Sequence, residues 1–181
     1  MAVNGKLTMI LLVSLATFGC LILSVECYSD GAPTEVCEDM LPKHGAPAQT
    51  GPSPYTLTLN RKSVKPGESV TLTLAAKDSG KFKGFLVQAR DSTGSPIGSF
   101  MPLPASKTNN EFKGKWKLLS CPKGPANNTA THVNSIEKSR VILTWIAPKN
   151  LSQSFKFLYT VAKNGGEYWV GIETESISVT K

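Results

Sequence analysis

The sequence contains little of what metal binding or nucleophilic catalysis requires. Only two histidines are present, His44 and His132, and they lie far apart; no Cys-x-x-Cys pair occurs. Structural zinc sites are built from closely spaced cysteines and histidines, and a catalytic cysteine needs a histidine partner. The sequence therefore predicts no metal, no cofactor and no cysteine-protease chemistry.

One stretch, FKGFLVQARDSTGSPIGSF (Phe82 to Phe100), has the appearance of a fragment of an active site. Pepsin-like proteases carry Asp-Thr-Gly or Asp-Ser-Gly twice, whereas here an extra residue follows Asp91 and there is no second copy. A phosphate-binding loop would need Gly-Lys-Ser/Thr at the start of a helix. We interpret DSTGSP as a turn, in which Asp91 bonds local backbone, Gly94 takes a positive φ and Pro96 sets the exit. No enzymatic arrangement remains.

Amphipathic helices are also missing, because no stretch of about 12 residues or more shows helical spacing of apolar side chains. Apolar residues instead recur at every second position, which is typical of strands. Around Gly84 the alternation changes parity, as in a bulge or in a strand that is buried on both faces. The predicted fold is an all-β antiparallel sandwich, with strands in six segments: 55–60, 69–76, 112–119, 140–147, 155–163 and 168–179.

The chain has one long apolar run, from Leu7 to Val25 after Lys6. It predicts a secretory signal peptide over 1–27, with Val25 and Cys27 at the −3 and −1 positions of the cleavage site. Because the run is longer than a usual signal core, an uncleaved membrane anchor is the alternative. We expect cleavage, a secreted extracellular protein without stable membrane insertion, and one domain over 28–181 whose leader, 28–54, is rich in proline and glycine and irregular.

Cleavage after Cys27 leaves two cysteines, Cys37 and Cys121, an even number that suits an oxidising compartment. A bridge between them would close a loop of about 85 residues, for which chain entropy gives roughly 4.5 kcal/mol. It would also tie the leader to the body of the domain.

Basic residues outnumber acidic ones, and the formal net charge is +7. Between Arg61 and Lys163 there are 17 lysines and arginines against five acids. Such a body favours polyanionic partners such as anionic lipids, lipopolysaccharide or sulfated glycans, although ordinary solvated lysines would give the same count. Nucleic acid is not expected, since no nucleic-acid-binding module is recognisable and the chain is exported.

A row of lysines is the most specific basic feature. Lys113, Lys115 and Lys117 alternate with apolar residues, so in a strand they would form a line on the solvent face at about 6.6 Å spacing. Lys81 and Lys83 are candidates to extend this face toward an anionic ligand, as is Lys123. The alternative is that the row only keeps a sheet face solvated.

Three tryptophans and two glycosylation sequons complete the candidate residues. Trp116, Trp145 and Trp169 fall within strand patterns, and we expect them in the core rather than on a sugar-binding surface. Asn127, in Asn-Asn-Thr, and Asn150, in Asn-Leu-Ser, are acceptor sequons in turn-like surroundings, which matters in a secreted chain.

Five blocks resemble, in order, the reeler domain, the module at the N-terminus of reelin: GFLVQARD, PIGSF, CPKGPANNTATHVN, VILTWIAP and FLYTVAKNGGEYWVGI. The leader DGAPTEVCEDMLPKHG resembles the start of short secreted members, chiefly insect defense proteins including the nodulation-promoting type. The resemblance implies an immunoglobulin-like β-sandwich and a Cys37–Cys121 bridge.

The same resemblance implies a non-enzymatic role in innate immunity: binding of microbial surface components, defense against bacteria, and haemocyte aggregation or nodulation. The partners would be microbial polyanions or glycans and the haemocyte surface. The alternative function is an extracellular-matrix or adhesion module that binds sulfated glycans or a protein receptor.

Overall fold

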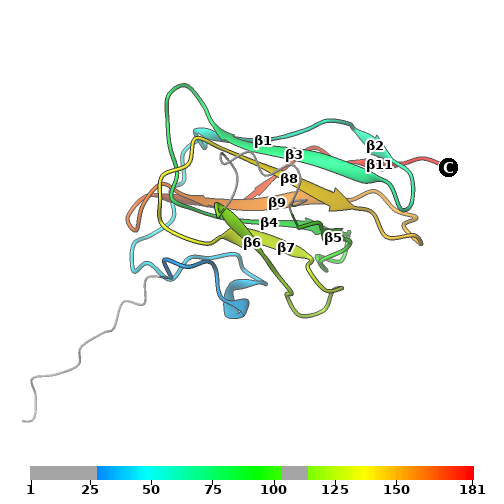
Figure 1. Ribbon diagram of the computed structural model, residues 1–181, viewed down its shortest axis with the longest axis horizontal. Coiled ribbons are helices and arrows are strands. Elements are labelled where there is room, and N and C mark those ends of the chain that lie inside the picture. Colours follow the sequence, from blue (N-terminus) through cyan, green and yellow to red (C-terminus); the bar gives the residue numbers. More distant parts are fainter. Residues whose placement is uncertain (1–27, 103–113) are drawn as a thin grey trace, which may run out of the picture.

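The computed structural model describes residues 28–102 and 114–181. The expected signal peptide 1–27, and with it the strand residues Phe112 and Lys113, lie outside the described residues. Two β-sheets pack face to face in the described parts of the chain, and most strand pairs are antiparallel (Figure 1). Within these ranges no helix is long and apolar enough to cross a bilayer.

The four-stranded sheet has the order β1-β3-β8-β5, with β1 (Tyr55–Leu59), β3 (Ser69–Ala76), β8 (Arg140–Ile146) and β5 (Ser99–Phe100). The five-stranded sheet has the order β10-β9-β4-β7-β6, with β10 (Tyr168–Glu173), β9 (Lys156–Ala162), β4 (Gly84–Arg90), β7 (Thr129–His132) and β6 (Trp116–Leu119). A parallel ribbon joins β2 (Ser63–Val64) to β11 (Ser178–Val179). The predicted antiparallel sandwich is confirmed.

The core lies between the two large sheets and is built by the period-two alternation of the sequence. Leu57 pairs with Leu74 across β1 and β3, and Leu72 pairs with Leu143 across β3 and β8. These side chains are buried, and Trp145 is fully buried beside Phe155. Burial of such side chains contributes about 1.5–3 kcal/mol each, so this interior is the main source of stability.

Strand β4 is buried on both of its faces, which explains the change of parity around Gly84. Phe85 and Val87 face the sandwich core, whereas Leu86 packs with Val36 and Met40 in a second, smaller cluster. The bulge lies instead in β10, where the pairing with β9 shifts register between Trp169 and Ile172.

The leader 28–54 provides the second layer over β4. It contains a short 3₁₀ turn, η1 (Thr34–Val36), and lies against the face of the five-stranded sheet that points away from the sandwich core (Figure 1). The amide of Ala32 donates to the Thr131 hydroxyl at 3.0 Å, and the Thr160 hydroxyl donates to the Met40 carbonyl at 2.9 Å. The irregular leader is thus docked by hydrogen bonds from its backbone to strand side chains.

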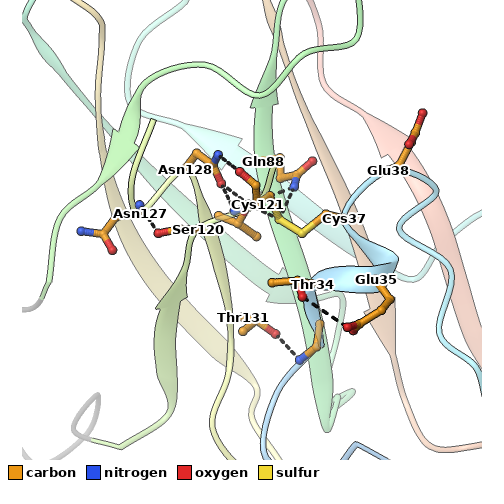
Figure 2. Close-up of a disulfide and its surroundings, with 12 residues drawn as sticks. Thr34, Glu35, Cys37, Glu38, Gln88, Ser120, Cys121, Asn127, Asn128 and Thr131 are labelled. Atoms are coloured by element: carbon orange, nitrogen blue, oxygen red, sulfur yellow. Dashed lines mark hydrogen bonds between the residues drawn. A yellow bond between two sulfur atoms is a disulfide. The ribbon is translucent and has the colours of Figure 1, made fainter. Parts of the chain in front are cut away.

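The predicted disulfide is present and joins the leader to the domain (Figure 2). The Cα atoms of Cys37 and Cys121 are 5.7 Å apart across a sequence separation of 84. Beside the bridge, the buried Gln88 amide donates to the Thr129 hydroxyl at 2.9 Å. Asn128 accepts from the Cys121 amide at 2.9 Å and donates to its carbonyl at 2.8 Å. These pairings satisfy the polar groups that the bridge brings into the interior.

The segment DSTGSP forms the predicted turn. The Asp91 carboxylate accepts from the amides of Thr93 and Ser95, at 2.9 and 3.1 Å, and from the Thr93 hydroxyl. These hydrogen bonds, led by that of the Thr93 hydroxyl, hold the pKa of Asp91 below its ordinary value. Gly94 has φ +81°. Asp91 therefore organises a turn.

Candidate functional site

Lysines from separate segments of the chain lie near one end of the five-stranded sheet. Antiparallel pairing brings the starts of β4 and β6 beside the end of β7, through the pairs Leu86↔Thr131 and Trp116↔His132. Lys83 immediately precedes β4, and Lys117 lies in β6. With only β7 between β4 and β6, their backbones are about 10 Å apart. Lys43, from the leader, lines the same pocket as Lys83. We call Lys43, Lys83, Lys115 and Lys117 the basic end.

Two of the three lysines of the predicted row, Lys115 and Lys117, lie among the described residues. Trp116 at the start of β6 is buried, whereas Lys117 is exposed and Lys115, just before the strand, is half-buried. Lys113 lies outside the described residues. The stem of Lys117 crosses the leader at Gly31, where an added Cβ would overlap it. The outer face of β6 is therefore a surface shared with the leader rather than a bare sheet face.

Two other candidate lysines face carboxylates. Lys81 pairs with Glu137 at 3.1 Å, and Lys123 pairs with Glu38 at 3.6 Å. Both pairs are exposed, so each contributes little to stability. The neighbouring negative charge weakens Lys81 and Lys123 as candidates for binding an anion.

His132 links the leader to the sheet. Its Nδ1 accepts from the Phe85 amide at 3.2 Å, and its Nε2 lies 3.3 Å from the Tyr28 carbonyl oxygen. The neutral tautomer with its proton on Nε2 satisfies both contacts. Burial lowers the pKa of His132, and the charges of Lys138 and Lys117 lower it further. His132 is thus a neutral structural residue at physiological pH.

The His44 ring packs edge-on against the Tyr168 ring, with the ring centroids 5.5 Å apart. Across 28–102 and 114–181, no three potential metal ligands come together.

Lys138 is a buried cation that the sequence pattern did not reveal. It is 1% exposed, and its ammonium donates to the carbonyls of Lys83, Asn134 and Ile136 at 3.0, 2.8 and 2.7 Å. Burial, with a smaller effect of Lys115, lowers its pKa to about 8. Lys138 precedes β8 in a loop, where no alternation predicts which side chains are buried. It holds this loop against the start of β4.

Both sequon asparagines are exposed, in loops. Asn127 follows β6 with φ +57°, and Asn150 lies in the turn between Pro148 and Leu151. Thr129, in the first sequon, is buried and hydrogen-bonded to Asn128. Glycosylation at either asparagine stays a prediction.

The tryptophans lie in or against the core, as predicted. Trp145 is fully buried and its indole N–H donates to the Ile97 carbonyl at 3.0 Å. Trp116 is buried, and Trp169 is half-buried and packs on the main core.

Comparison with known proteins gives the class of this chain. Residues 35–181 match the Reeler domain, and the chain belongs to the Reeler domain family. It is similar to "Putative defense protein Hdd11" of Hyphantria cunea, with 38% identity over 171 residues that cover 91% of this chain and 98% of that protein. It is also similar to "Defense protein l(2)34Fc" of Drosophila melanogaster, with 34% identity and coverage of 88% and 94%.

Two further matches are more limited: one covers only part of a longer protein, and the other is a likeness of fold to a solved structure. "Putative ferric-chelate reductase 1" of Xenopus laevis is 35% identical over 91% of this chain, but the match spans only 26% of that protein. The human F-spondin reeler domain has a TM-score of 0.58 at 16% identity and covers 75% of this chain and 94% of its own. At this identity the likeness shows the fold alone.

Proposed function

We propose that this protein is a secreted innate-immune defense protein that binds anionic components of microbial surfaces, such as lipopolysaccharide. Binding acts through the basic end and promotes haemocyte aggregation or nodulation. The observation that carries the proposal is that strand pairing places Lys83, Lys115 and Lys117 near one end of the five-stranded sheet, where Lys43 lines the same pocket as Lys83. The names of the similar defense proteins, which the chain matches over most of their length, support the same direction.

The physical basis is many weak contacts on a repetitive surface. A single exposed ion pair contributes about 0–1 kcal/mol and is screened by salt. Several lysines that meet closely spaced phosphates add their contributions, and a multivalent surface raises the effective concentration of sites. The protein then acts by binding and not by catalysis.

The test replaces lysines of the basic end and measures binding to immobilised lipopolysaccharide at low and at high salt. The variant carries Lys83→Gln, Lys115→Gln and Lys117→Gln. The control carries Lys65→Gln and Lys149→Gln, two exposed lysines outside the basic end.

We expect the basic-end variant to lose affinity by about an order of magnitude or more at low salt, and the control to lose little. Equal affinity of the variant and the wild type would reject the basic end as the site. Stronger binding of the wild type to heparin than to lipopolysaccharide would point to the adhesion function instead.

A further inference from the structure

A pocket lies between the leader and the outer face of the five-stranded sheet. Its volume is about 120 Å³. Gly84 and Leu86 of β4, with Ala162 of β9, line it from the sheet, and Val36 and Met40 line it from the leader. The leader docks across the sheet like a second layer but does not fill the space beneath it.

Small residues line the floor of the pocket. Gly84 has no side chain, which leaves room for the His132 ring, since a Cβ placed there would lie 3.2 Å from that ring. Ala162 contributes only a methyl group to the pocket. The hydroxyl of Thr160, which also lines the pocket, donates to the Met40 carbonyl and accepts from the Gly171 amide at 3.2 Å. The interior therefore offers a ligand mainly apolar surface.

Charge at the opening is of one sign. Lys43 and Lys83 both line the pocket and are exposed. Among the described residues that line it, none is an aspartate or a glutamate. An apolar interior with two cations at its opening is complementary to an amphiphile with an apolar tail and an anionic head.

We propose that the pocket binds one fatty-acyl chain of an anionic lipid, whose head group lies against Lys43 and Lys83. This inference rests on the proposed function, which supplies the occupant: an acyl chain of the lipid portion of lipopolysaccharide. Sulfated glycans have no such tail, so the pocket separates acylated from purely saccharide polyanions. Each methylene that leaves water for the pocket should raise affinity about fourfold until the space is full.

The first test titrates the purified secreted protein with fatty acids of increasing length, from butyrate to dodecanoate. We expect affinity to rise about fourfold per methylene and then to level off. Affinity that does not depend on chain length would overturn the proposal. The Lys43→Glu, Lys83→Glu double variant should weaken binding of decanoate and spare its methyl ester; equal weakening of both would place the head group elsewhere.

A variant at the pocket opening gives the matched comparison. Gly165 lines the pocket, has no positive φ and has open space around its Cβ position, so Gly165→Phe should fold and obstruct the opening. Gly166→Phe is the control, because this neighbour in the same turn does not line the pocket. We expect at least tenfold weaker decanoate binding for Gly165→Phe only. Equal binding by both folded variants would overturn the proposal.

Lipopolysaccharide and its chemically deacylated form separate this inference from the proposed function. Tighter binding of the intact form, with the difference lost in Gly165→Phe, supports the pocket. Equal binding of both forms by the wild type overturns the acyl-chain inference and leaves the proposed function standing. Binding of neither form contradicts the proposed function, while the fatty-acid titration still decides whether the pocket takes an acyl chain.

Discussion

Removal of the disulfide should destabilise the domain mainly through its unfolded state. The perturbation is the double variant Cys37→Ala, Cys121→Ala. The bridge spans a sequence separation of 84, and the loop-closure relation gives about 4.6 kcal/mol for a loop of that length. A domain of ordinary stability, about 5–15 kcal/mol, should stay folded but become marginal.

The native contacts around the bridge should survive this change. The Cys121 sulfur accepts from Gln88 and Thr129, but each donor also lies within reach of another acceptor: the Thr129 hydroxyl for Gln88, and the Asn128 side chain for Thr129. Arg90 still donates to the carbonyl at position 37, at 2.6 Å. Gln88 and Thr129 therefore each keep a hydrogen-bond partner beside the lost bridge, and the leader keeps its position.

The assay is equilibrium unfolding in urea, followed by the fluorescence of tryptophans that lie in the core. We expect a loss of about 4.5 kcal/mol in the free energy of unfolding, with a somewhat larger m-value because the unfolded chain expands. Wild-type protein unfolded under reducing conditions is the control and should show the same loss. A loss below about 1 kcal/mol, or free thiols in protein collected from culture medium, would refute the reasoning.

Two further predictions concern the interior. Since the pKa of Lys138 is lowered to about 8, its charge opposes folding at neutral pH, and stability should rise between about pH 8 and 10.5; Lys138→Met should remove this slope. The raised pKa values of Tyr55 and Tyr159 lower the stability as the pH rises above about 10, in the wild type and in the variant alike. The quantity to measure is therefore the difference in the free energy of unfolding between the wild type and Lys138→Met at each pH. Gly98→Ala should lower the free energy of unfolding by about 2–4 kcal/mol, as measured by thermal unfolding, because φ at this position is +61° and a Cβ would overlap the Trp145 indole. Gly94→Ala, with φ +81° and open space, should cost only about 1 kcal/mol, and equal losses would argue against the overlap.

Much of the sandwich could be predicted from local patterns. Alternation at Leu72 and Leu143 shows which side chains face inward, because side-chain direction in a strand repeats every two residues. The turn at Asp91 depends only on residues within its own segment, and the cysteine count needs no structure. In β4, however, alternation alone could not distinguish a bulge from a strand that is buried on both faces. A strand covered on both sides has no exposed face, so polar residues do not alternate with apolar ones along it.

The basic end and the pocket depend on tertiary structure. Lys83 and Lys117 are distant in sequence and come to the same end of the sheet only because β7 pairs with both β4 and β6. Leu86 meets Met40 because the leader crosses the outer face of the five-stranded sheet. Alternation and turn chemistry are local properties of the chain, so the sequence by itself determined the longer strands, their inward faces and the cysteine pair. It did not predict β2, β5 or β7, whose two to four residues are too short for an alternating pattern, nor the break between β10 and β11. Strand order and the docking of the leader minimise the exposed apolar surface of the whole molecule, and only that global packing decided which lysines meet and where space remains beneath them.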